Sequence, residues 1–263
     1  MSDTNPPQTL EHAPVPRRSW LMRLWLWVPD WVFRVAGVAV FVSFISPRVP
    51  MYLKDFWSVG SWFQPAGAKK IAMPWGTVLV DVTYLLIVLG FVFRIPPRTR
   101  AARPREIVLP MVAAFWPFVP WWILGFARQF HAGWADDYSV FMMDGGTWTM
   151  TRFAVGSGLI ILGNALDVWG YATLLRSLSI VAEARVLKVH GPYRIARHPI
   201  YLGQFLAQGG MWLFYANTHA VWIAFWAVFV TMQLVRSKIE EGVLERAFGE
   251  TYRQYKAKTF WFV

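Results

Sequence analysis

The sequence contains no cysteine, and only 16% of its 263 residues are charged. The lack of cysteine excludes disulfide bonds, thiolate metal sites and cysteine nucleophiles. Hydrophobic residues, by contrast, make up 56% of the chain, including 17 tryptophans and 20 phenylalanines. This composition is typical of a protein that crosses the membrane several times, and not of a soluble domain.

The charge that is present is strongly basic, with a formal net charge of +11. Most of the 26 Lys and Arg residues fall in four clusters, at 17–23, 94–105, 176–197 and 236–258, between long apolar runs. Basic loops next to apolar runs are typical of membrane flanks, so we expect no nucleic-acid partner. The positive-inside rule puts all four clusters, and both termini, on the cytoplasmic side. Because no targeting segment is found, we expect a multi-pass protein of the bacterial inner (cytoplasmic) membrane.

The apolar runs predict an all-α fold with about six transmembrane helices. Residues 1–19 are polar and rich in proline, so we expect a disordered cytoplasmic tail, followed by one integral membrane domain over 20–263. The last two helices are joined by a short turn at 216–219 and form a C-terminal helical hairpin. The expected helices lie within 20–45, where Pro29 interrupts the run, and at 76–93, 107–127, 150–175, 200–215 and 221–235.

The densest polar motif is KVHGPYRIARHPIYLG, at residues 188–203. Pro192 and Pro199 push the residues before them out of helical geometry, so Gly191 and His198 are expected outside regular helix. Pro199 suits the first turn of the next helix. The motif therefore predicts an ordered loop that places Arg197 and His198 at a helix N-terminus, which is an arrangement suited to anions.

A second polar motif, RSKIEEGVLERAFGETYRQYKAK, follows at 236–258. The Arg236 and Glu240 side chains are four residues apart, which supports a helix that leaves the membrane. Gly249 is expected to end this helix, and a short amphipathic helix is expected beyond it. By itself the motif also fits a solvated tail with surface ion pairs.

The predicted topology brings the two motifs together, because the hairpin returns Glu240 and Glu241 to the side where Arg197 and His198 lie. A pocket with a guanidinium at one end and carboxylates at the other suits a zwitterion that carries a carboxylate, an ammonium and ribose hydroxyls. S-adenosylmethionine is such a molecule, and it carries a sulfonium as well.

The same residues resemble a known family. The pattern Gly191-Pro192-Tyr193, Arg197-His198-Pro199, Tyr201, Gly203, Arg236, Glu240-Glu241, Leu244, Phe248-Gly249, Tyr252 and Tyr255 resembles the isoprenylcysteine carboxyl methyltransferase and phospholipid methyltransferase superfamily. The resemblance covers about residues 176–258. It implies a helical membrane enzyme whose cytoplasmic pocket binds S-adenosyl-L-methionine, while the acceptor enters from the lipid side. The chain departs from the family at 259–263, which lack the expected proline and basic residues.

Roles for individual residues follow from the resemblance. Arg197 would orient the cofactor or the acceptor, and with Glu241 it is a catalytic candidate. The resemblance does not name the acceptor, which is expected to be a lipid or small hydrophobic molecule with a carboxylate, amine or thiol. The cofactor-binding candidates are His190, Gly191, Tyr193, His198, Pro199, Tyr201, Gly203, Arg236, Glu240, Glu241 and Tyr252, although His190 also fits a solvated loop residue.

A third catalytic candidate comes from the predicted helix at 150–175. Asn164, Asp167 and Tyr171 lie on one face at spacings of three and four residues. A carboxylate within the membrane is usually functional, and an amine or thiol acceptor must lose a proton. The alternatives for Asp167 are a structural ion pair with Arg34 or a hydrogen bond to a neighbouring helix.

Two other function classes stay open at this point. An NADPH-dependent membrane reductase of the sterol C14 reductase type would have a similar fold with a nucleotide beneath the hairpin. A non-enzymatic membrane scaffold would bind neither cofactor. No metal site is expected, because His131, Asp136 and Asp137 lack helical pairing.

Overall fold

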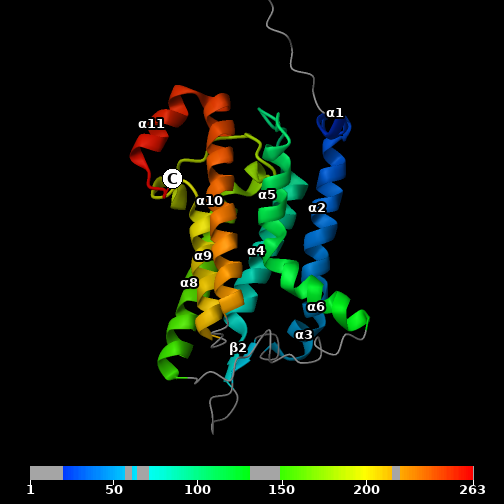
Figure 1. Cartoon of the computed structure of the whole chain (residues 1–263), viewed down its shortest axis with the longest axis vertical. Helices are drawn as coiled ribbons and strands as arrows, with labels where there is room; N and C mark the ends of the chain where they lie inside the picture. The colour runs from blue at the N-terminus through cyan, green and yellow to red at the C-terminus, as the bar shows by residue number, and fades with distance from the viewer. Residues whose placement is uncertain (1–19, 57–60, 64–70, 131–148, 215–219, 263) are drawn as a thin grey trace, which may run out of the picture.

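The computed structural model describes residues 20–56, 61–63, 71–130, 149–214 and 220–262. Most of these residues form one bundle of long helices (Figure 1). The ends of the chain that the structure describes, α1 (Trp20–Trp27) and α11 (Glu250–Lys258), lie at one end of the bundle, called the upper end below (Figure 1). The main helices are α2 (Asp30–Ile45), α4 (Pro74–Phe93), α5 (Arg105–Phe115), α8 (Met150–Leu174), α9 (Pro199–Phe214) and α10 (Ala220–Phe248).

The N-terminal run breaks where the sequence predicts. Helices α1 and α2 are separated at Pro29, whose extended backbone precedes the first turn of α2. Beyond α2, a 3-10 turn at Ser46–Arg48 and the short α3 (Val49–Lys54) complete the lower end. The fold is helical, as predicted, and the described residues add one small antiparallel pair of strands, β1 (Ser61–Phe63) and β2 (Ile71–Met73).

The helix expected at 107–127 is also interrupted. Helix α5 ends at Phe115, a 3-10 turn covers Trp116–Phe118, and α6 (Val119–Gln129) continues in another direction (Figure 1). The turn contains Pro117, which has no N–H for an α-helical hydrogen bond. Among the described residues, three helical stretches are long and apolar enough to cross a membrane: Asp30–Lys54, Trp75–Phe93 and Met150–Ser177. They fit an integral membrane protein, while the count of six spans stays a prediction.

The C-terminal elements agree closely with the expectations. Helix α9 starts at Pro199, His198 precedes it outside any helix, and α10 ends at Phe248 before Gly249. Gly249 has a positive φ of 52°, which a residue with a side chain adopts only at a cost, and α11 follows it. Helix α10 has 29 residues and is thus about 44 Å long, so it reaches beyond a hydrocarbon core of about 30 Å.

Helices α8 and α9 pack most extensively because small residues let their backbones approach. A Cβ on Gly163 would lie 2.5 Å from the Gly203 carbonyl oxygen, and a Cβ on Gly203 would lie 2.6 Å from that of Gly163. Side chains at either position would therefore push the helices apart, as in other membrane helix pairs that are joined through small residues. This close crossing fixes the position of Asp167 on α8 relative to that of Tyr201 on α9.

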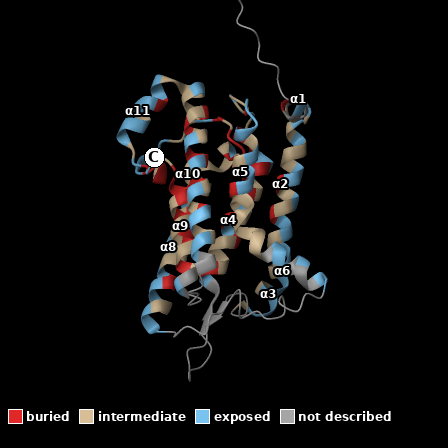
Figure 2. Ribbon diagram, viewed as in Figure 1, coloured by how far each residue is buried: buried red, intermediate tan, exposed pale blue. Residues whose placement is uncertain are grey.

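The loop from α8 to α9 is ordered by backbone pairing at the upper end. Thr99 and Ala184 form an antiparallel bridge, and the Ala182 N–H donates to the Glu106 carbonyl oxygen at 2.9 Å. Ala182 and Ala184 also pack against Val243 of α10. Figure 2 shows buried residues along α9, α10 and this loop, whereas α2 exposes much of its surface. The loop is thus a fixed part of the fold, as the motif at 188–203 predicts.

Candidate active site

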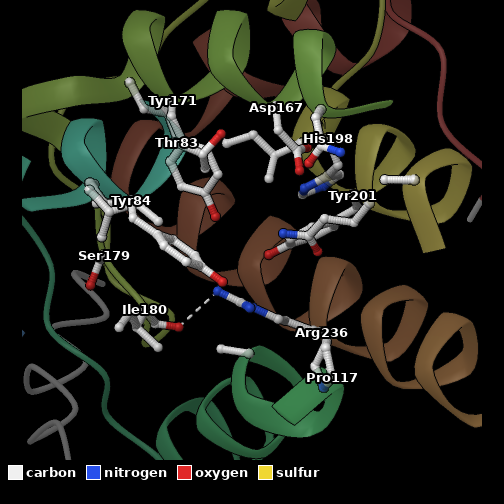
Figure 3. A pocket seen from close by; sticks show the side chains of 18 of the residues that line it. Thr83, Tyr84, Pro117, Asp167, Tyr171, Ser179, Ile180, His198, Tyr201 and Arg236 are labelled. Carbon is white, nitrogen blue, oxygen red and sulfur yellow. Dashed lines mark hydrogen bonds between the residues drawn. The ribbon is translucent and has the colours of Figure 1, made fainter. Parts of the chain in front are cut away.

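A cavity of about 630 Å³ extends through the bundle. At the upper end its wall carries polar groups from the loop after α8 and from α11, including Arg197, His198 and Tyr252. Towards the lower end the wall becomes largely aromatic and aliphatic, with Phe118 from the turn before α6 and Met211 from α9. Figure 3 shows that side chains from α4, α8, α9 and α10 point into this space. The cavity therefore joins a polar end to an apolar end.

Arg197 is held at the polar end by a buried ion pair. Its Nε donates to Glu241 Oε1 at 2.6 Å, and its Nη1 donates to the Thr259 carbonyl oxygen at 2.7 Å. The second carboxylate oxygen of Glu241 accepts from Lys256 Nζ, also at 2.6 Å. The Arg197 and Glu241 side chains are 8% and 6% exposed. One carboxylate thus connects the loop, α10 and α11 at the edge of the cavity.

The charge state of Glu241 follows from these contacts. Burial by itself would raise the pKa of Glu241. The neighbouring His198, Lys256 and Arg197 side chains lower this pKa by more than burial raises it, so that its value is about 2. The carboxyl group is therefore ionised at neutral pH. His198 Nε2 lies 3.5 Å from Glu241 Oε1, which is a longer distance than the two bonds from Arg197 and Lys256, and this nitrogen makes no hydrogen bond.

Glu240, the preceding residue on α10, faces the cavity instead. The Tyr201 hydroxyl donates to Glu240 Oε1 at 2.6 Å, and Arg236 Nε donates to the same oxygen at 2.8 Å. Arg236 also donates to the Ile180 carbonyl oxygen, as the dashed line in Figure 3 marks, and its guanidinium lies over the Tyr201 ring. This network joins α9, α10 and the loop through a single carboxylate oxygen.

The C-terminal residues after α11 pack against the loop that carries His198. The Arg197 N–H donates to the Phe260 carbonyl oxygen, and Phe260 pairs with Ala196 as a parallel bridge. The Trp261 ring lies 4.9 Å from the His198 ring, and its Nε1 donates to Ser237 Oγ at 2.8 Å. Residues 259–262, which depart from the family pattern, therefore form a strap that packs the loop against α10.

Among the buried polar atoms of the cavity wall that have no hydrogen-bond partner in the described residues are two at its polar end, His198 Nε2 and the Tyr252 hydroxyl. Burial raises the pKa of the Tyr252 phenol, and the Glu241 charge raises it further, so the hydroxyl keeps its proton and can donate. Buried polar groups are rarely left without a partner. A hydroxyl donor and an imidazole nitrogen beside paired carboxylates and guanidinia fit a ligand with carboxylate, ammonium and hydroxyl groups, as S-adenosylmethionine has.

The cofactor candidates divide into two sets by position. Those in the cavity wall are Tyr193, His198, Tyr201, Arg236, Glu240 and Tyr252, together with the catalytic candidates Arg197 and Asp167. The other candidates, His190, Gly191, Pro199, Gly203 and Glu241, are absent from the wall. His190 is exposed, while Gly203 and Pro199 are buried at the start of α9. Glu241 acts on the wall through Arg197. Gly191 has a positive φ of 59°, which shapes the turn before Tyr193.

The predicted face on α8 is confirmed, because Asn164, Asp167 and Tyr171 all line the cavity. The alternative of an ion pair between Asp167 and Arg34 is wrong. Arg34 instead bonds to Asp30, one turn earlier on α2, and to the Arg94 carbonyl oxygen. Arg34 is engaged at the upper end of α2, so its guanidinium is not available to α8.

Sequence reasoning missed two residues that hold the site. Lys256 closes the Glu241 network from α11, and Trp261 packs on His198 from the strap. A Lys among other C-terminal basic residues gives no signal of its own. A tryptophan in a chain with 17 of them is equally inconspicuous. Only the apolar ending at 259–263, in place of a basic one, pointed to this region.

Comparison with known proteins agrees with the motif. Residues 151–251 match the family model described as phospholipid methyltransferase. This range includes α8 except its first residue, the loop, α9, all of α10 and the first two residues of α11. A search of curated proteins gives no match. The family match confirms the resemblance to the isoprenylcysteine carboxyl methyltransferase and phospholipid methyltransferase superfamily, and it points to a methyltransferase of the membrane.

Proposed function

We propose that this protein transfers a methyl group from S-adenosyl-L-methionine to a lipid-like acceptor within the membrane. The observation that carries the proposal is the cavity itself, which joins a polar end at Arg197, His198 and Glu240 to an apolar end between the helices. A polar cofactor and an apolar acceptor could meet inside one enclosed space of this kind. The family match over residues 151–251 supports the reaction class.

The polar end offers complementary groups for the cofactor. Arg197 would face its carboxylate, Glu240 would face its ammonium or ribose hydroxyls, and Tyr252 could donate to a further acceptor atom. Because Glu241 and Lys256 hold Arg197, and Tyr201 and Arg236 hold Glu240, these groups are fixed before the ligand arrives. A prearranged site loses less conformational entropy on binding.

The apolar end would receive the acceptor. Its wall includes Phe41 of α2, Phe115 and Phe118 near the α5–α6 break, and Phe225 and Phe229 of α10. Aromatic and aliphatic walls suit a hydrocarbon chain, while the headgroup would lie near Asp167, where the wall becomes polar. We infer that the upper end faces the cytoplasm, because the basic clusters gather there.

The chemistry requires alignment more than acid or base groups. When bound, S-adenosylmethionine would supply an electrophilic methyl group on its sulfonium. The chain's own contribution is to hold donor and acceptor in line and to exclude water from the space between the helices. The buried ion pairs at the polar end fix the orientation of Arg197 and Glu240, and hence of whatever those side chains bind.

The test is calorimetric titration of S-adenosylmethionine into the purified protein in detergent. We expect saturable binding that Glu241→Gln and His198→Ala each weaken at least tenfold, which corresponds to about 1.4 kcal/mol. Glu245→Gln is the matched control, since Glu245 lies one turn further along α10 and pairs with the exposed Arg253. It should bind the cofactor as the wild type does.

NADPH forms a second arm of the same titration, because a membrane reductase would bind it instead. No binding of S-adenosylmethionine by folded wild-type protein would refute the proposal. Binding that Glu245→Gln weakens as much as Glu241→Gln would refute the assignment of the polar end as the cofactor site.

A further inference from the structure

The most unusual buried acidic group in the described part of the chain is Asp167. It lies on α8 about 10 Å below the end of that helix, at 1.5 Å per residue, and it is 5% exposed. Its Oδ1 is buried and has no hydrogen-bond partner among the described residues. By comparison, Asp81 on α4 accepts from Arg48 and from the Tyr52 hydroxyl. A buried carboxylate without such bonds is costly, so its presence calls for a ligand.

The surroundings of Asp167 favour a role in the cavity over a role in packing. The residue lines the cavity, together with Asn164 and Tyr171 from the same face of α8. Figure 3 shows Asp167 and Tyr171 in this wall. Gly203 of α9 lies directly against its carboxylate, so a side chain at 203 would collide with Oδ1. The glycine at position 203 thus leaves room for the Asp167 side chain beside the α9 backbone. This position lies between the polar end and the apolar end of the cavity.

Neighbouring groups could satisfy Asp167 but do not. The Asn164 amide donates back to the Ile160 carbonyl oxygen of its own helix. Arg236, a nearby cation of the same wall, is engaged with Glu240 and the Ile180 carbonyl oxygen. The carboxylate therefore stays available to a molecule in the cavity, and that molecule must bring its own hydrogen-bond donor.

We propose that Asp167 accepts the proton that the acceptor headgroup loses, and that the acceptor therefore carries an N–H or S–H group and not a carboxylate. This inference rests on the proposed function and adds to it the class of headgroup. A carboxylate headgroup has no proton to give at neutral pH, so it could not donate a hydrogen bond to the unpartnered Asp167 oxygen. An amine or a thiol would supply the donor that Asp167 lacks.

The proton transfer is balanced without any further reagent. The N–H bond of an ammonium headgroup, or the S–H bond of a thiol, breaks, its proton moves to an Asp167 carboxylate oxygen, and the bonding electron pair stays on nitrogen or sulfur. That pair then forms the new bond to carbon, while the donor sulfur leaves with the electrons of its own carbon–sulfur bond. The proton leaves the carboxyl group in a later step, which returns Asp167 to its starting state.

The first experiment measures methyl transfer to three amphiphiles of equal chain length, which are dodecylamine, dodecanethiol and dodecanoic acid. We expect transfer from labelled S-adenosylmethionine to the amine or the thiol and none to the acid. Asp167→Asn keeps the shape of the side chain but removes the base, and should lower that transfer about 100-fold or more. Its affinity for S-adenosylmethionine should stay within twofold of wild type.

The second experiment needs no cofactor and measures the thermal stabilisation that dodecylamine gives beyond dodecanol. We expect the extra stabilisation in wild type and its loss in Asp167→Asn. Ser157→Ala is the matched control, because Ser157 is also on α8 and has a buried oxygen without a partner, but does not line the cavity. This variant should behave as wild type in both experiments.

Two results would overturn the inference. One is methyl transfer to amine or thiol that Asp167→Asn leaves undiminished, and the other is transfer to the acid alone. If no amphiphile is methylated, the stabilisation decides, and its persistence in Asp167→Asn counts against Asp167. Failure of the proposed function is distinguishable, because it removes S-adenosylmethionine binding from every variant and leaves the dodecylamine comparison intact.

Discussion

The two ends of the cavity are built in different ways. At the upper end, linked hydrogen bonds join the loop, α10, α11 and the strap. The single carboxylate of Glu241 accepts from both Arg197 and Lys256. At the lower end one cluster, Asp81 with Arg48 and Tyr52, fixes α4 to the segment after α2 beside a largely apolar wall. The comparison indicates that the upper end is prearranged for a charged ligand, whereas the lower end uses its polar groups to join helices.

The strongest test of this difference between the two ends is to remove one charge at each end. Arg197→Ala leaves Glu241 and two backbone carbonyls without a guanidinium, so we expect a loss of about 3–5 kcal/mol in the free energy of unfolding. Asp81→Asn breaks the lower cluster and should also destabilise the protein. Thermal unfolding in detergent measures both effects.

The difference between the ends then appears in cofactor affinity. S-adenosylmethionine binding should be lost in Arg197→Ala and retained in Asp81→Asn when both are measured below their unfolding temperatures. Equal loss of affinity in the two variants would mean that the ends are not functionally distinct.

The strap offers the next largest effect. Trp261→Ala removes a ring that is 8% exposed from the contact with His198, and large-to-small changes of this type cost about 3–5 kcal/mol in a packed core. We expect the affinity for S-adenosylmethionine to fall at least tenfold, and Trp261→Phe to recover part of it. Phe262→Ala removes a neighbouring ring of the strap that is 55% exposed, and it should lower both quantities less than Trp261→Ala does.

The charge on Glu241 predicts how acid affects the upper end. The pKa of this group is about 2 in the folded protein, below its ordinary value of 4.5. Its contribution to stability is therefore complete above about pH 4.5 and is lost as the pH falls towards 2. Unfolding temperatures measured from pH 7 to pH 3 should decline in the wild type and decline less in Glu241→Gln. An equal decline in both would contradict the assignment.

The smallest expected effect tests a single hydrogen bond. Ser237→Ala removes the acceptor for the Trp261 indole N–H but leaves the ring in place. We expect a loss of about 1 kcal/mol in the free energy of unfolding, and a smaller loss of cofactor affinity than Trp261→Ala gives. A larger effect than that of Trp261→Ala would mean that Ser237 itself serves the site.

Much of this arrangement was determined by the sequence. Pro199 set the start of α9 and Gly249 the end of α10, because proline suits the first turn and glycine adopts positive φ without strain. The spacing of Asn164, Asp167 and Tyr171 set one face of α8, since three and four residues make one helical turn. The arginine-histidine-proline motif and the paired glutamates marked the upper end before any geometry was known.

Tertiary structure alone decided which of these groups face the cavity. Glu240 and Glu241 are neighbours on one helix and therefore point in different directions, one to the wall and one to Arg197 and Lys256. No pattern in the sequence distinguishes them. The strap and the absence of a partner for Asp167 also depend on segments far apart in the chain. Such contacts form when distant segments pack together, so no local pattern in the sequence predicts them.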